Sequence, residues 1–146
     1  MNTAPAPEGQ AAAEKAVGVP KRTESLRMGA AVAIAVAGSL IHNALEFGVP
    51  SVLAIANGEA FLVIPLVGAF LVWWRSTTWR GAAAWVLVVL AALNLIGGAV
   101  LTALPLGFLP FEPEQSWNHY LSHIVYGFGQ VPLIIQGSQY LGKRAS

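Results

Sequence analysis

The stretch GAAAWVLVVLAALNLIGGAVLTAL, residues 81–104, contains no charged side chain. A helix of this length would be about 36 Å long at about 1.5 Å per residue. The hydrocarbon layer of a bilayer is about 30 Å thick and needs about 20 apolar residues to cross it. This stretch therefore predicts a transmembrane helix.

The rest of the chain agrees with a membrane protein. Only 10% of the 146 residues are charged, whereas soluble domains carry about 25%. Three further apolar runs, residues 26–47, 51–74 and 116–141, each come close to the length of a span. The sequence predicts an all-α fold: a polytopic membrane protein whose four transmembrane helices form one bundle over residues 25–142.

Two segments are harder to assign. The polar step Asn57-Gly58-Glu59 interrupts the second apolar run. We favour a continuous helix from residue 51, and a short interfacial segment over residues 49–56 is the alternative. Residues 1–24 carry few large apolar side chains and predict a disordered tail. Residues 143–146 form a short C-terminal segment.

The basic residues predict the orientation. All eight lysines and arginines fall on one side of a four-helix topology: Lys15, Lys21, Arg22, Arg27, Arg75, Arg80, Lys143 and Arg144. The positive-inside rule makes that side cytoplasmic, so we expect a plasma-membrane protein with both termini in the cytoplasm. A net charge of +1 gives no electrostatic footprint for nucleic acid.

Each predicted helix carries a polar side chain at a similar height. His42, Glu59, Asn94 and His123 lie about 21–26 Å from the basic side at the rise of an α-helix. Because an ionisable group facing lipid costs several kcal/mol, these side chains should face the bundle interior. The candidate metal ligands are His42, Glu46, Glu59, His119 and His123, and the supporting polar residues are Ser39, Asn43, Asn94, Tyr126 and Gln130.

Several functions are compatible with such a layer. The leading hypothesis is that its members hydrogen-bond one another, as in a structural or accessory subunit of a larger membrane complex or in a homo-oligomer. Imidazole and carboxylate groups are also ligands for transition metals, and two facing histidines could hold a haem. Buried Glu and His can carry protons or ions as well, although few titratable groups continue such a path towards the basic side.

The composition excludes some kinds of site and leaves others open. The absence of cysteine excludes disulfides and thiolate metal sites. A small-molecule or lipid pocket opening outward, with Glu112 and Glu114 at its rim, is a further alternative. The sequence determines neither an enzymatic activity nor a cofactor.

Overall fold

The computed structural model describes residues 22–49 and 59–145, except for the side chains of residues 59 and 60. In these ranges every regular element is a helix and there is no strand. The elements are α2 (Arg22–Phe47), α3 (Glu59–Arg75), α4 (Arg80–Leu93), the π-helix η3 (Asn94–Leu101), which continues α4 directly, and α5 (Trp117–Ala145). The prediction of an all-α fold is confirmed for this part of the chain.

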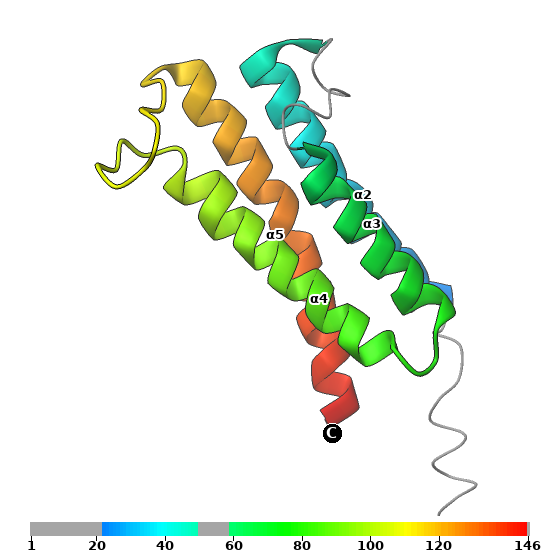
Figure 1. Cartoon of the computed structure of the whole chain (residues 1–146). Helices are drawn as coiled ribbons and strands as arrows, with labels where there is room; N and C mark the ends of the chain where they lie inside the picture. The colour runs from blue at the N-terminus through cyan, green and yellow to red at the C-terminus, as the bar shows by residue number, and fades with distance from the viewer. Residues whose placement is uncertain (1–21, 50–58, 146) are drawn as a thin grey trace, which may run out of the picture.

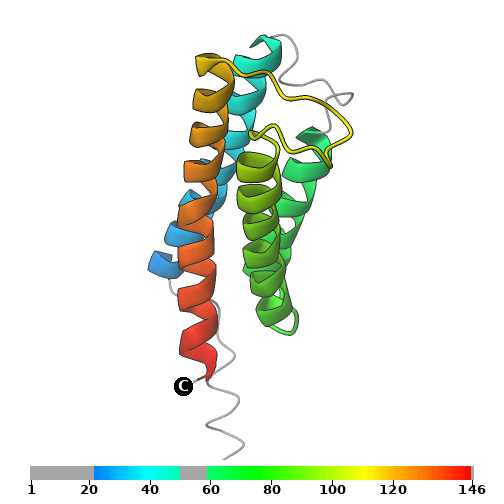
Figure 2. The ribbon, with the colours of Figure 1, turned by 90° about the vertical axis from the view of Figure 1, so that its left-hand side faces the viewer.

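The helices lie side by side and alternate in direction (Figures 1 and 2). We call the end that holds Arg22, Arg75 and Arg80 the basic end. The opposite end, where α2 finishes and α5 begins, is called the histidine end. Helix α5 packs most extensively on α2 and also contacts α4 and η3. Helix α5 therefore lies between α2 on one side and α4 with η3 on the other.

Local sequence determines where α2 ends and α5 begins. Gly48 has a φ of 83°, a left-handed conformation that favours glycine and terminates α2. At the start of α5, the Ser116 hydroxyl accepts a hydrogen bond from the His119 backbone N–H at 3.2 Å. A serine in this position satisfies one of the orphan donors of a helix N-terminus. His119 is thereby fixed within the first turn of α5.

The apolar core fills the half of the bundle nearer the basic end. Its buried members are Met28, Ala31, Val32, Ala35, Leu66, Trp73, Ala83, Ala84, Leu87, Ala91 and Leu133. Above this core, α2 and α5 approach closely at Gly38 and Gly129, where a Cβ on Gly129 would lie 3.1 Å from the Gly38 Cα. This backbone contact brings the polar faces of α2 and α5 together towards the histidine end.

Two of the described helical segments are long and apolar enough to cross a membrane, namely Arg22–Phe47 and Arg80–Leu101. The apolar part of α3, Phe61–Arg75, is shorter, and α5 carries too many polar residues to meet the same criterion. Helix length and hydropathy therefore support two spans and do not by themselves establish the predicted bundle of four.

The helix boundaries differ from the predicted ones at several points. Residues 22–24, which composition assigns to the disordered tail, form the first turn of α2, where Glu24 lies 3.6 Å from Lys143 of α5. Helix α5 extends past residue 141 to Ala145. Its last turn contains Lys143 and Arg144, whose positive charge is favourable at a helix C-terminus.

The remaining boundaries concern the two middle helices. The third predicted helix, 81–104, corresponds to α4 with η3 and ends at Leu101. The second predicted helix, 51–74, corresponds to α3, whose described part begins at Glu59. Its predicted start at residue 51 lies outside the described residues, as do residues 1–21 of the tail.

Candidate functional site

All three histidines of the chain gather at the histidine end. The ring centroid of His123 lies 4.7 Å from that of His42 on α2 and 4.4 Å from that of His119, one turn away on α5. His119 and His123 are buried, and His42 is half-buried. The predicted convergence of the imidazoles from two different helices is therefore present in the structure.

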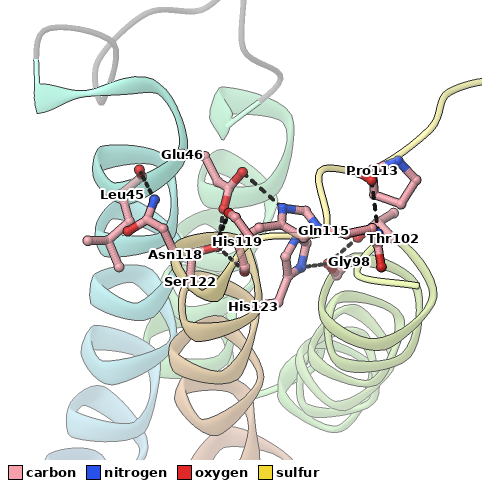
Figure 3. Close-up of polar contacts among 11 residues, drawn as sticks. Leu45, Glu46, Gly98, Thr102, Pro113, Gln115, Asn118, His119, Ser122 and His123 are labelled. Atoms are coloured by element: carbon pink, nitrogen blue, oxygen red, sulfur yellow. Dashed lines mark hydrogen bonds and ion pairs between the residues drawn. The ribbon is translucent and has the colours of Figure 1, made fainter. Parts of the chain in front are cut away.

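The Glu46 carboxylate reaches from α2 to α5 (Figure 3). Its Oε2 atom accepts a hydrogen bond from His119 Nδ1 at 3.1 Å, and its Oε1 atom accepts one from the Ser122 hydroxyl. Nearby, Asn118 Nδ2 donates to the Leu45 carbonyl at 2.8 Å, which occupies one of the orphan carbonyls in the last turn of α2. The start of α5 is thus tied to the end of α2 by three hydrogen bonds.

A ring nitrogen of His42, one of His123 and a carboxylate oxygen of Glu46 all lie within 4.8 Å of one another. These three side chains come from two helices and are half-buried or buried. We refer to His42, Glu46, His119 and His123 as the histidine cluster. It contains four of the five metal-ligand candidates that the sequence predicts.

The hydrogen bonds of the cluster determine which ring nitrogens carry protons. His123 Nδ1 lies 2.9 Å from the Gly98 carbonyl, which can only accept a hydrogen bond. His123 Nδ1 is therefore a donor, and His119 Nδ1 is a donor to the Glu46 carboxylate. In a neutral imidazole the Nε2 atom then carries the lone pair. His42 Nε2 and His119 Nε2 are buried and have no hydrogen-bond partner among the described residues.

The π-helix η3 supplies the Gly98 carbonyl. The Thr102 N–H donates to Gly97 at 3.2 Å, one residue further back than in an α-helix, so the Gly98 carbonyl is left to accept from the Thr102 hydroxyl and from His123. A Cβ on Gly98 would also lie 2.5 Å from Cε1 of Tyr126. Single π-helical turns are rare and are frequent at functional sites.

The supporting polar residues continue the polar face below the cluster. Ser39, Asn43, Tyr126 and Gln130 are all buried between α2 and α5, and the Tyr126 ring centroid lies 5.1 Å from that of His42. Gln130 Nε2 donates to the Ala35 carbonyl at 3.4 Å. Beyond Gln130 the core is formed by apolar residues such as Leu87 and Leu133, and the next buried polar side chain among the described residues is Arg80 at the basic end.

Two residues of the predicted polar layer, Asn94 and Glu59, are not part of the histidine cluster. Asn94 is buried in η3, and its amide nitrogen has no hydrogen-bond partner within the described ranges. The side chain of Glu59 lies outside the described part of the structure, so its predicted contact with His42 and His123 does too. Glu112 and Glu114 are exposed in the loop before α5 and do not belong to the cluster.

Sequence reasoning missed two partners of the cluster. Ser122 lies three residues after His119, on the same helical face, and this spacing could have identified it. The Gly98 carbonyl could not have been found in this way, because its availability depends on the π-helical shift at Thr102. In the sequence, Gly97-Gly98 indicates only a place of close helix approach.

Comparison with known proteins adds no family. No protein-family model matches the chain, and neither a curated protein nor a solved structure is similar enough to count as a match.

The hydrogen bonds of Glu46 lead to a prediction about stability. In Glu46→Ala, the buried His119 Nδ1–H loses its acceptor, which should cost about 1–3 kcal/mol of unfolding free energy. The Ser122 hydroxyl keeps a second acceptor, the His119 carbonyl at 2.7 Å. A double-mutant cycle with His119→Ala should give a coupling energy of about 0.5–3 kcal/mol, measured by denaturant titration of the purified protein. Glu112→Ala, in the exposed loop, is the control, and additive effects of the two substitutions would contradict the prediction.

Proposed function

We propose that this protein is a multi-pass membrane protein that binds a divalent transition-metal ion through His42, Glu46 and His123. In this proposal His119 positions the carboxylate of Glu46. The observation that carries the proposal is that His42 Nε2 is buried without a hydrogen-bond partner in the described structure, while a nitrogen of the same ring lies within 4.8 Å of a Glu46 carboxylate oxygen and a His123 nitrogen. Burying an unpaired nitrogen costs about 1–3 kcal/mol, and coordination would remove this cost.

The donor set fits a transition metal in chemistry, and its atoms lie close together. Zinc binds nitrogen and oxygen ligands at about 2.0–2.2 Å in a tetrahedral arrangement, so two ligands of one ion lie about 3.3–3.6 Å apart. The three donors lie within 4.8 Å of one another, so the most distant pair has to close by up to about 1.5 Å around an ion of this size. Two imidazoles and one carboxylate suit zinc, copper, iron or manganese better than the oxygen-seeking calcium ion.

Hydrogen bonds from neighbouring groups orient two of the three donors, His123 and Glu46. Metal-binding histidines usually donate their other N–H to a carbonyl or carboxylate, as His123 does to Gly98. Ligating carboxylates are usually hydrogen-bonded in turn, as Glu46 is by His119 and Ser122. These contacts hold the donors in place before an ion arrives.

The alternative functions are less well supported. A purely hydrogen-bonded structural cluster would pair its buried imidazole nitrogens, and His42 Nε2 is not paired within the described residues. A haem between His42 and His123 would need a gap for the porphyrin, whereas their rings are in T-shaped contact at 4.7 Å. Proton or ion conduction would need polar groups beyond Gln130, where the interior is occupied by residues such as Leu87 and Leu133.

The membrane part of the proposal rests on the outward faces of the helices. Besides the two apolar spans, α5 exposes Leu121, Ile124 and Phe128 by 52–73% while it buries its polar side chains. This arrangement, with polar groups inside and apolar groups outside, is what a bilayer requires. Because the described basic residues lie towards one end, the positive-inside rule assigns the basic end to the cytoplasm and the histidine end to the outside of the plasma membrane.

Metal content tests the proposed site directly. The purified full-length protein, equilibrated with zinc and passed through a desalting column, should retain about one ion per chain by elemental analysis. His42→Ala and His123→Ala should lose it, and His119→Ala should weaken binding about 10–100-fold because it removes the hydrogen bond that orients the Glu46 carboxylate. Glu112→Gln should behave as the wild type. A wild type without metal, or a fully loaded His42→Ala variant, would overturn the proposal.

Cysteine accessibility tests the topology without background, since the chain has no cysteine. Single cysteines are introduced at Thr3 and at Gln115, and intact cells are treated with a membrane-impermeant thiol reagent. We expect labelling at position 115 and protection at position 3 until the cells are opened. The reverse pattern would show that the orientation is wrong, and labelling at both positions would contradict an even number of spans.

A further inference from the structure

A groove of about 280 Å³ lies between η3 and α5, on the outside of the bundle. Its walls are almost entirely apolar and include Leu95, Ala99, Ile124, Phe128 and Val131. Beside the groove the two helices approach closely, because a Cβ on Gly127 would lie 3.2 Å from both Ala99 Cβ and Leu95 Cδ1. The missing side chain of Gly127 therefore keeps η3 and α5 together along this groove.

One member of the histidine cluster also lines this groove. His123 is buried, with 6% of its surface exposed. Tyr120 is the other polar residue that lines the groove, and the remaining lining residues are apolar or glycine. The ring of His123 is fixed by its hydrogen bond to Gly98, which leaves Nε2 with the lone pair. The groove and the proposed metal site thus meet at a single imidazole.

Described residues close the cluster in two further directions. Towards the basic end lies the apolar core, with Leu66, Leu87 and Leu133 fully buried. Towards α2, the hydrogen bonds of Glu46 and Asn118 join the two helices. A molecule that approaches His123 through the groove passes between η3 and α5, and in a bilayer this opening faces lipid.

We propose that the groove binds a small lipophilic molecule with an alkyl or aryl body and one nitrogen- or oxygen-donor head group, and that the head group reaches the site at His123. This inference rests on the proposed function, because the metal ion is what the head group would bind. The volume equals about nine times the space of one liquid water, enough for a body of about ten heavy atoms. An apolar wall with one polar group at its end is typical of small-molecule sites.

The test compares three probes that share parts of one structure. 4-Phenylimidazole has both the aryl body and the donor head, imidazole has only the head, and biphenyl has only an aryl body. In the cobalt-loaded full-length protein, 4-phenylimidazole should shift the visible cobalt bands at a concentration at least tenfold lower than imidazole, while biphenyl should leave them unchanged. Equal potency of 4-phenylimidazole and imidazole would overturn the proposal.

A matched pair of variants locates the binding site. Ile124→Trp fills the groove, whereas Leu121→Trp adds the same bulk one turn away on the same helix, and the wild-type residues are 52% and 53% exposed. Ile124→Trp should weaken 4-phenylimidazole binding at least tenfold with cobalt still bound, and Leu121→Trp should have no effect. Equal effects of the two variants would show that the ligand does not use the groove.

A metal-free measurement separates this inference from the proposed function. A photoactivatable phenyl diazirine should label groove residues of the metal-free protein, and 4-phenylimidazole should compete with that labelling in the wild type and in Leu121→Trp. If the protein binds no metal but competition persists, the groove is a ligand site and the metal proposal is wrong. If no competition occurs in the metal-free or the cobalt-loaded protein, the groove proposal is wrong, whatever the metal content.

Discussion

The Glu46 carboxylate is the link on which the arrangement of the histidine end depends. It accepts hydrogen bonds from His119 and Ser122 and so joins the last turn of α2 to the first turns of α5. A carboxylate that is partly withdrawn from water needs hydrogen-bond donors, and those of Glu46 lie on the facing helix. This requirement, together with the close backbone contact at Gly38 and Gly129, fixes the register in which His42 meets His123.

The irregular backbone of η3 complements this link from the other side of α5. In a continuous α-helix the Gly98 carbonyl would also accept from the Thr102 N–H, which would compete with His123 for its two lone pairs. The π-helical shift frees that carbonyl, and the missing side chain of Gly98 makes room for Tyr126. Two separate elements therefore orient the imidazoles, and the groove that we propose as a ligand site opens along the same irregular segment.

Helical periodicity was enough to predict which residues would share a face. His119, His123, Tyr126 and Gln130 follow one another at intervals of 3 and 4 residues, and all four are buried on α5. Pairing across helices was only partly predictable: heights from the basic end placed His42 opposite His123, but not Ser122 or the Gly98 carbonyl beside them. Those contacts depend on helix rotation and on the π-helical shift, which are consequences of tertiary packing. The same packing explains why hydropathy supports α2 and α4 with η3 as spans but not α5, whose polar groups are turned inward.

X-ray absorption spectroscopy of the zinc-loaded protein tests the central claim most directly, because it counts the ligands around the bound ion. The predicted first shell consists of nitrogen and oxygen atoms at about 2.0–2.2 Å. The outer-shell scattering should require two imidazole rings, and in His42→Ala it should require one fewer. A first shell of oxygen atoms without imidazole scattering, or a spectrum that is the same in His42→Ala, would contradict the assignment of the histidine cluster as a metal site.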